Sequence, residues 1–228
     1  MDERPFFITL GAQVKPSSTM QAREVNKSRN RNALLEAAAE LIAEGGIGAA
    51  SVSAICARAQ LSRGMVHLHF ENKDALLLEV AKYLNAQYFE TVEAALANAP
   101  DDAPNRVRTI IETDLGESLL NEHKVNIWYA FRGLSQARTD VLAYSDTRDD
   151  ALREPLLEAF LDMAPARQRD PQRARDATHG TLALLEGMWT DYYLHSDAFS
   201  RDSAVRIVCL FVGSLYPAHG AVFGLKPR

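Results

Sequence analysis

The sequence predicts an all-α protein of about nine helices, divided into a small N-terminal and a larger C-terminal helical domain. Three observations support this fold class. Apolar residues recur at helical spacing along most of the chain, strand-like alternation is absent, and glycine and proline fall between the periodic segments. Hydrophobic residues make up 47% of the 228 residues, so the chain can bury a sizeable core.

The breaks between the periodic segments set the expected limits of the helices. Gly45 and Gly46 end the first helix, because a left-handed residue commonly follows a last helical turn. Ser51 and Ser62 are suitable N-caps for two short helices. The segment 99–104 contains two prolines and separates the fourth helix from the fifth. We therefore expect helices at about residues 26–44, 51–59, 62–70, 73–98, 105–121, 124–137, 148–163, 172–195 and 201–215.

The two short helices form a helix-turn-helix pattern. Ile55 and Ala59 of the first can pack against Val66 and Phe70 of the second. Ser62 begins the second helix, so the exposed N-terminal end of that helix can enter the major groove of DNA. Such a helix needs small or polar residues on its outer side, and these are Arg63, Gly64 and His67.

The segment SVSAICARAQLSRGMVHLHFENKDALL resembles the DNA-binding signature of the tetracycline-repressor (TetR) family, over residues 27–80. Gln60 stands where the family usually has a turn glycine, and a left-handed Gln60 would cost about 1 kcal/mol. His67 stands where the family usually has an aromatic phosphate contact. The matching positions are Ser51, Ile55, Arg58, Ala59, Ser62, Gly64, His69, Phe70, Lys73, Ala75 and Leu76.

This resemblance implies a set of DNA contacts. Arg63 is the expected bidentate partner of a guanine. Lys73 begins the long helix, whose dipole favours an anion. Arg29 and Arg31 could add backbone or minor-groove contacts. The full expected set is Arg29, Arg31, Ser51, Ser53, Ser62, Arg63, Met65, His67, His69 and Lys73.

Two aromatic clusters in the C-terminal half are candidate effector-binding residues. Aromatic faces beside one carboxylate suit a primary or quaternary ammonium ion, although the same side chains could simply fill a core. Their layout resembles that of the choline-responsive (BetI-type) repressors within the family, whereas Arg132 could favour an anionic ligand. The candidates are Trp128, Tyr129, Phe131 and Arg132 in one helix, and Glu186, Trp189, Tyr192 and Tyr193 in another.

The last two helices, within residues 172–215, are apolar on more than one face and need a covering surface. A second copy of the chain would supply it and would present two recognition helices to a palindromic double-stranded operator. We therefore expect a flexible arm at 1–25, a DNA-binding domain at 26–73, and a ligand-binding and dimerisation domain at 74–228. The resemblance implies a repressor that a small effector, such as choline or another small amine, releases from its operator.

The charge distribution agrees with this interpretation. Residues 15–73 carry eight basic and five acidic side chains, whereas the whole chain has a net charge of −5. A basic end on an acidic body suits a protein that touches phosphates at one end. The alternative is a helical interaction protein that keeps this fold but does not read a DNA sequence. The two departures from the family pattern, Gln60 and His67, would be compatible with such a loss of DNA recognition.

Other classes of function are not expected. The motifs HExxH, GxSxG and the P-loop are absent, and His67 and His69 at a spacing of two point apart on a helix, so we expect no enzyme, metal or cofactor. The two cysteines, Cys56 and Cys209, lie in apolar helical patterns. With no secretory signal and no apolar run of about 18 residues, a reduced cytoplasmic protein without membrane contact is expected.

Overall fold

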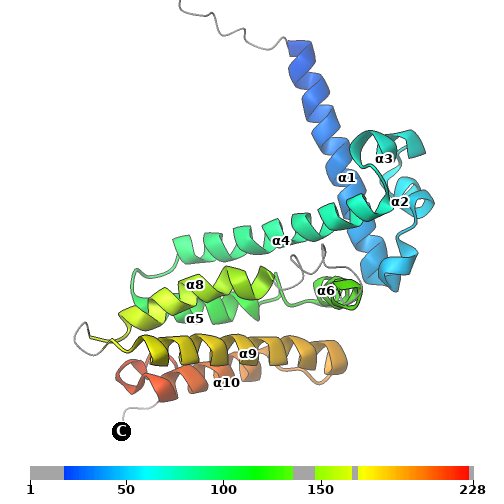
Figure 1. Cartoon of the computed structure of the whole chain (residues 1–228). Coiled ribbons are helices and arrows are strands. Elements are labelled where there is room, and N and C mark those ends of the chain that lie inside the picture. Colours follow the sequence, from blue (N-terminus) through cyan, green and yellow to red (C-terminus); the bar gives the residue numbers. More distant parts are fainter. Residues whose placement is uncertain (1–17, 136–146, 166–168, 226–228) are drawn as a thin grey trace, which may run out of the picture.

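The computed structural model describes residues 18–135, 147–165 and 169–225 of the chain (Figure 1). Within these residues there are nine α-helices, one short 3₁₀ helix and no strand, which confirms the all-α class. The elements are α1 (Ser18–Ala49), α2 (Val52–Ala59), α3 (Arg63–His69), α4 (Lys73–Ala97), α5 (Ala103–Asp114), α6 (Glu122–Ser135), α8 (Thr147–Asp162), α9 (Pro171–His195), α10 (Arg201–Leu215) and η2 (Pro217–His219).

Helix α1 begins earlier than expected, and a kink at Gly45 and Gly46 divides it where the sequence predicts its end, before a last short segment that reaches Ala49. It begins at Ser18, so residues 18–25 of the expected flexible arm are helical. Their sequence, STMQAREV, is rich in good helix formers, which explains the longer helix. Gly46 has a φ of 71°, in the left-handed region, and breaks the helix where the sequence predicts its end.

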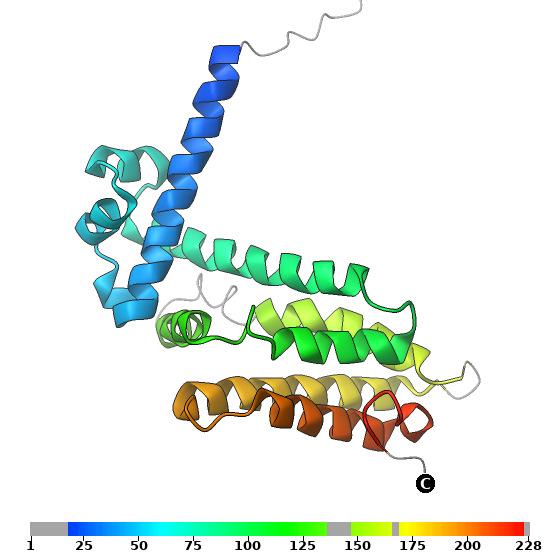
Figure 2. The same cartoon turned by 180° about the vertical axis from the view of Figure 1, so that it is seen from behind.

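The helices form two bodies that meet near the start of α4. Helices α2 and α3 lie against α1, and the N-terminal part of α1 projects beyond them (Figures 1 and 2). The long helix α4 leads from this part into the C-terminal body, where it lies over α5 and α8. Helices α9 and α10 form the opposite layer. This is the fold that the sequence predicts, a helix-turn-helix domain joined to a helical domain.

The two bodies have separate apolar cores, and the boundary between these cores does not fall at residue 73. The first core contains the buried faces of α1, α2 and α3 together with Leu76, Leu77 and Val80 from the start of α4. It also includes Ile127 and Phe131 from α6. The second core joins α4, α5, α8, α9 and α10. Helix α6 therefore contributes to the core of the DNA-binding part, although it lies far from that part in the sequence.

Three remaining observations concern the described residues only. Cys56 and Cys209 are buried and unpaired, and burial raises the pKa of the Cys209 thiol to about 11. No three His, Cys, Asp or Glu side chains gather there in an arrangement that could hold a metal ion. None of the helices in this part of the chain has both the length and the apolar character needed to cross a membrane.

Candidate nucleic-acid interface and ligand cavity

The turn between α2 and α3 has the geometry of a helix-turn-helix. Gln60 lies in the left-handed region, with φ of 55° and ψ of 37°. Its backbone N–H closes the last turn of α2. Ile55, Val66 and Phe70 are buried and belong to one apolar core, as the sequence predicts. The outer side of α3 is thereby fixed relative to α2.

The N-terminal end of α3 exposes the side chains expected to enter the major groove. Ser62, Arg63 and His67 are exposed, and Met65 is half-buried. The Nη2 atom of Arg63 donates a hydrogen bond to Oγ of Ser53, on α2, at 2.7 Å. This bond brings two of the expected DNA contacts together and holds the guanidinium of Arg63 at the outer edge of the motif.

Three further expected contacts lie around this surface. Ser51 is the N-cap of α2, and its Oγ accepts a hydrogen bond from the N–H of Ala54 at 3.2 Å, which leaves its hydroxyl proton available to a phosphate. Lys73 is half-buried at the first residue of α4. Arg29 is exposed on α1.

His69 and Arg31 face other parts of the protein. The Nε2 atom of His69 is buried without a hydrogen-bond partner in the described part of the chain. Burial, and then the positive charges of Lys27 and Arg31, lower the pKa of the His69 imidazole. Arg31 forms an ion pair with Glu79 of α4, and its guanidinium carbon lies 5.5 Å from the centre of the Phe70 ring. In this arrangement, neither side chain offers a free cation to DNA.

A cavity of about 60 Å³ lies between α4, α6 and α9. The indole rings of Trp128 and Trp189 meet edge to face in its wall, with ring centres 6.1 Å apart. The indole N–H of Trp128 is buried and has no hydrogen-bond partner among the described residues. The cavity is lined by Ala81, Leu84, Asn85, Tyr88, Leu119, Lys124, Ile127, Trp128, Phe131 and Trp189.

A buried carboxylate orients two of these aromatic rings. Asp114 is fully buried, and its two oxygens accept hydrogen bonds from the hydroxyl of Tyr88 at 2.7 Å and from the indole N–H of Trp189 at 3.0 Å. Sequence reasoning missed this residue. Its position in the sequence could have revealed it, because Asp114 lies on the same face of α5 as the buried apolar residues Val107 and Ile111.

Lys124 is the cationic side chain of the cavity wall. Burial lowers the pKa of its ammonium group. Its Nζ donates a hydrogen bond to the backbone carbonyl of Ser118 at 2.6 Å. A ligand in the cavity therefore meets several aromatic faces, one lysine and one unpaired indole N–H.

Five of the eight predicted ligand residues lie outside the cavity lining. Tyr129 stacks on Tyr193, with ring centres 4.3 Å apart. Arg132 forms an ion pair with Glu186. The carboxylate that was expected to face an ammonium ligand is therefore bound to the arginine that could have favoured an anionic one. Tyr192 packs edge to face on Phe199. The contacts of Tyr129 and Arg132 join α6 to α9, and the contact of Tyr192 packs the end of α9 against the segment that follows it. The predicted residues that line the cavity are Trp128, Phe131 and Trp189.

Helix α6 connects the cavity to the DNA-binding part. Ile127 and Phe131 line the cavity and also belong to the core formed with α1, α2 and α3. The side-chain amide of Asn126 donates a hydrogen bond to the carbonyl of Ala43, in α1, at 3.3 Å. A change in the cavity wall can therefore reach α1 through direct contacts.

The outer faces of α9 and α10 carry exposed apolar side chains. Leu194 and Tyr193 at the end of α9 are 62% and 46% exposed, and Ile207 and Leu210 on α10 are 41% and 36% exposed. In contrast, most large apolar side chains of these helices are buried or half-buried. Ile207 and Leu210 form an uncovered apolar strip on α10 in the isolated chain, whereas the ring of Tyr193 is stacked on Tyr129 of α6.

Two family models match separate parts of the chain. Residues 34–80 match the family model described as "Bacterial regulatory proteins, tetR family". Residues 103–217 match the model described as "BetI-type transcriptional repressor, C-terminal". The chain is 30% identical to the HTH-type transcriptional regulator BetI of Pseudomonas fluorescens over 178 residues, which cover 78% of this chain and 88% of that protein. A regulator of the same name from Stenotrophomonas maltophilia is 28% identical over 78% of this chain and 88% of its own length.

Solved structures give the same result. A transcriptional regulator from Pseudomonas aeruginosa aligns with a TM-score of 0.75 at 25% identity, over 88% of this chain and 99% of its own. A transcriptional regulator from Saccharomonospora viridis, solved in complex with choline, aligns with a TM-score of 0.70 at 21% identity, over 81% of this chain and 96% of its own. The relatives and structures named here are transcriptional regulators and not enzymes, in agreement with the sequence prediction.

Proposed function

Because the chain belongs to the TetR family of ligand-responsive transcriptional regulators, we propose that it is a repressor that binds a palindromic operator as a homodimer and leaves it when a small ammonium compound fills the cavity. Its site of action is then the cytoplasm, where operator DNA lies. The position of α6 carries this proposal, because Ile127 and Phe131 belong both to the cavity wall and to the core under the helix-turn-helix.

The DNA contacts in this proposal centre on the outer side of α3. Arg63 is held at the outer edge by Ser53 and is the side chain best suited to read a guanine. Lys73 and Ser51, at the starts of α4 and α2, are placed to bind phosphates. His67 adds an exposed polar contact on α3.

These roles predict different effects of two substitutions. Arg63→Ala should cost about 1–3 kcal/mol of binding free energy and relax preference at one base pair of each half-site. Lys73→Ala should weaken binding to all sequences and reduce the salt slope by about one unit. The measurement is fluorescence anisotropy with the DNA upstream of the gene and with base-substituted copies, over a series of salt concentrations. Equal effects of the two substitutions on all duplexes would contradict the assigned roles.

The cavity chemistry supports an ammonium compound that also carries an oxygen. The rings of Trp128, Phe131 and Trp189 offer aromatic faces to a cation. The ammonium group of Lys124, also in the wall, donates its hydrogen bond to the carbonyl of Ser118. The unpaired indole N–H of Trp128 calls for a hydrogen-bond acceptor. Choline combines these two groups in one small molecule, and a structural neighbour was solved with choline bound.

Matched ligands test this assignment. Isothermal titration calorimetry should show that choline binds more tightly, by about tenfold or more, than its uncharged carbon isostere, 3,3-dimethylbutan-1-ol. The reason is that a desolvated cation–π contact contributes about 2 kcal/mol. Trp128→Phe keeps an aromatic face but removes the N–H, and should weaken choline binding without abolishing it. The proposal also requires choline to lower the affinity for DNA, and DNA should then lower the affinity for choline by the same factor, because the coupling between two sites is reciprocal. Equal affinity for both compounds, or choline binding that leaves DNA affinity unchanged, would overturn the proposal.

The homodimer is assigned to α9 and α10. The exposed apolar side chains of Leu194 on α9 and of Ile207 and Leu210 on α10 favour a second copy of the chain as their partner. Pairing these helices across a two-fold axis would form a four-helix bundle and would leave both helix-turn-helix motifs free for the two half-sites.

A further inference from the structure

The N-terminal part of α1 projects from the molecule without a packing partner. The first buried side chain of α1 among those described is Leu34. At a rise of about 1.5 Å per residue, the segment 18–33 extends α1 by roughly 24 Å before this core contact. Figures 1 and 2 show the first turns of α1 projecting beyond α2, α3 and α4, and the segment first meets its neighbours at Arg31, which contacts Phe70 and Glu79. It adds little to the core, so burial gives no reason for its length.

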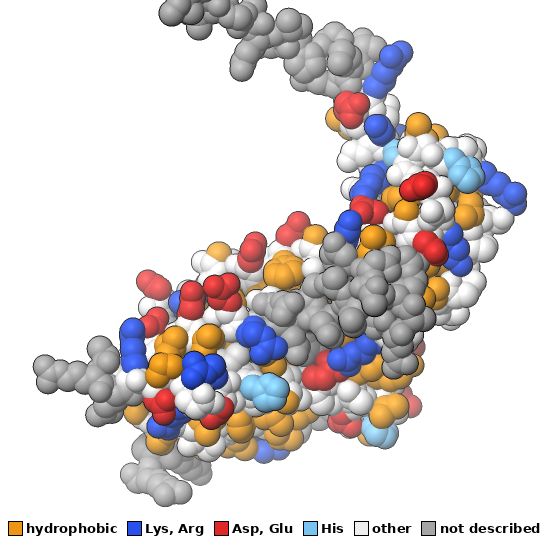
Figure 3. Space-filling model, in the orientation of Figure 1, with side chains coloured by type: hydrophobic (Ala, Val, Ile, Leu, Met, Phe, Trp, Pro, Cys, Tyr) orange, Lys and Arg blue, Asp and Glu red, His pale blue; other side chains and the backbone are white. Residues whose placement is uncertain are grey.

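The projecting segment is basic. Arg23, Lys27 and Arg29 are exposed, none of them has an ion-pair partner within the part of the chain that the structure describes, and Glu24 is the acidic residue beside them. Lys27 and Arg29 lie about 200° apart around the helix, so positive charge faces two sides. Figure 3 shows Lys and Arg side chains along this segment and at the helix-turn-helix, whereas Asp and Glu side chains are frequent along α4.

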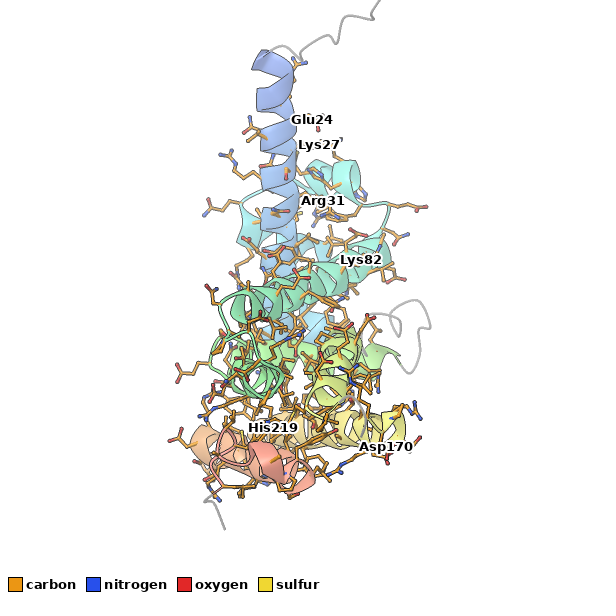
Figure 4. The ribbon with its side chains drawn as sticks, turned by 90° about the vertical axis from the view of Figure 1, so that its left-hand side faces the viewer. Glu24, Lys27, Arg31, Lys82, Asp170 and His219 are labelled. Carbon is orange, nitrogen blue, oxygen red and sulfur yellow. The ribbon has the colours of Figure 1, made fainter. Side chains whose placement is uncertain are left out.

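One side of the segment lies in line with the recognition helix. Lys27 and Arg31 follow each other along the same side of α1, with Lys82 of α4 below them (Figure 4). Arg31 contacts the ring of Phe70, the residue after α3, and pairs with Glu79. The charges of Lys27 and Arg31 also act on His69, at the end of α3. The basic segment therefore flanks the C-terminal end of α3, opposite the N-terminal end that is expected to enter the groove.

We propose that Arg23, Lys27 and Arg29 form a basic arm that binds the phosphates of duplex DNA next to the base pairs read by α3, without reading their sequence. The proposal rests on the DNA-binding role of the helix-turn-helix and extends the interface along α1. Exposed lysine and arginine on a projecting helix suit phosphate contacts, which supply affinity and not specificity. Arg31 is then a positioning residue, because its pairing with Glu79 and its contact with Phe70 fix α1 against α3 and α4.

The test compares the full-length triple variant Arg23→Ala, Lys27→Ala, Arg29→Ala with a control of equal charge change in the C-terminal body outside α9 and α10, Arg106→Ala, Arg153→Ala, Arg169→Ala. Affinities for a 40-base-pair duplex of mixed sequence (about four helical turns) and for the DNA upstream of the gene are measured at several salt concentrations. The arm variant should lower the salt slope by up to about three units per protomer on both duplexes, at about 0.9 units per lost phosphate contact. The ratio of the two affinities should not change. Hydroxyl-radical footprints should lose protection at their outer edges.

The outcomes separate the arm from the proposed function. Equal salt slopes for the arm variant and the control would overturn the arm while leaving the helix-turn-helix interface intact. A changed affinity ratio would show that the arm reads sequence, which also contradicts the proposal. A wild-type chain that binds neither duplex would overturn both proposals. Circular dichroism of each variant checks that the helices remain. If the wild type bound anionic vesicles and not DNA, the arm would be assigned to a membrane surface, and the proposal of a DNA-binding arm would be overturned.

Discussion

Gln60 sits at the one non-glycine position of the described residues with a positive φ. The left-handed region costs a residue with a Cβ atom about 1–2 kcal/mol. Replacing such a residue by glycine relieves this strain, but the larger conformational entropy of glycine in the unfolded chain offsets about 0.4–1 kcal/mol of the gain. We therefore expect Gln60→Gly to raise the free energy of unfolding by about 0.5–1 kcal/mol. The side chain of Gln60 is exposed, so no buried contact is lost.

Urea denaturation measures this effect, and Ala57→Gly is its control. Ala57 is exposed inside α2, where glycine should lower the stability by about 1 kcal/mol. Opposite signs at two positions three residues apart would show that backbone geometry decides the result. Destabilisation by Gln60→Gly would mean that the glutamine side chain makes a stabilising contact that outweighs the strain.

His69 predicts a dependence of stability on pH. Its folded-state pKa is lowered by burial and then by Lys27 and Arg31, whereas a histidine in the unfolded chain titrates near about 6.5. Below that pH the unfolded chain binds more protons at this site than the folded protein does. The stabilisation is therefore complete above about pH 6.5 and is lost as the pH falls toward the folded-state pKa.

Thermal unfolding between about pH 7.5 and pH 5.5, the interval that brackets the ordinary histidine pKa, measures this contribution. The Tm of the variant His69→Gln should fall less over this interval than the Tm of the wild type. His179→Gln, at an exposed position of α9, serves as the matched control and should behave like the wild type. Parallel pH profiles for His69→Gln and the wild type would remove His69 as the source.

At the scale of elements, helix α5 ends earlier than its sequence pattern predicts. The apolar spacing continues to residue 121, but the helix ends at Asp114. Arg201, the first residue of α10, donates hydrogen bonds to the backbone carbonyls of Leu115 at 2.7 Å and Leu120 at 2.5 Å. A side chain from a distant helix thus satisfies carbonyls on both sides of the break, which a local pattern cannot reveal.

Arg201→Ala should therefore lower the free energy of unfolding by about 2–3 kcal/mol, since each hydrogen bond from a charged donor contributes about 1.5–3 kcal/mol and water replaces part of the loss. Arg153→Ala changes the same charge at an exposed position of α8 and should change stability by less than about 0.5 kcal/mol. The measurement is urea denaturation of both variants. Equal stabilities would show that the two carbonyls find water without cost.

The elements that sequence predicts well are those with strong local signals. Gly46 breaks α1 and Ser51 caps α2 as expected, because both effects involve neighbouring residues. The helical start at Ser18 was missed because helix propensity in a polar segment carries no periodic apolar pattern. Helix α6 was expected in the ligand domain alone, yet Phe131 also packs in the core of the DNA-binding part, a contact that only the tertiary fold specifies.

The candidate cavity was predictable in part for the same reason. Trp128 and Trp189 were identified because large aromatic residues at helical spacing mark an inward face. Glu186, the carboxylate expected to face a ligand, pairs with Arg132, a contact that spacing along one helix cannot reveal. Asp114 escaped notice because a polar residue on an apolar stripe reads as an interruption until its partners are known.

At the scale of the whole molecule, the cavity and the DNA-binding part share residues of two helices. Ala81 of α4 belongs to the first core and also lines the cavity, and Leu84 lines the cavity and packs against that core. Ile127 and Phe131 provide a second connection through α6. A ligand that moves either wall changes the support of α1, and in a dimer this alters the distance between two recognition helices. The effect depends on a rigid dimer, since a movable partner would absorb the displacement.

The dimer surface therefore decides whether the molecule can act as a switch. The double variant Ile207→Glu, Leu210→Glu places two charges in the uncovered strip on α10 and should convert a dimer, at twice the 25.2 kDa of one chain, into a monomer. Ala86→Glu with Ala94→Glu adds the same charge to exposed positions of α4 and should leave the dimer intact. Sedimentation equilibrium distinguishes the two. The monomer should keep its helical content and bind choline, because the cavity lies within one chain, but it should bind a palindromic duplex no better than a half-site. A double variant that still sediments as a dimer would place the interface on another face.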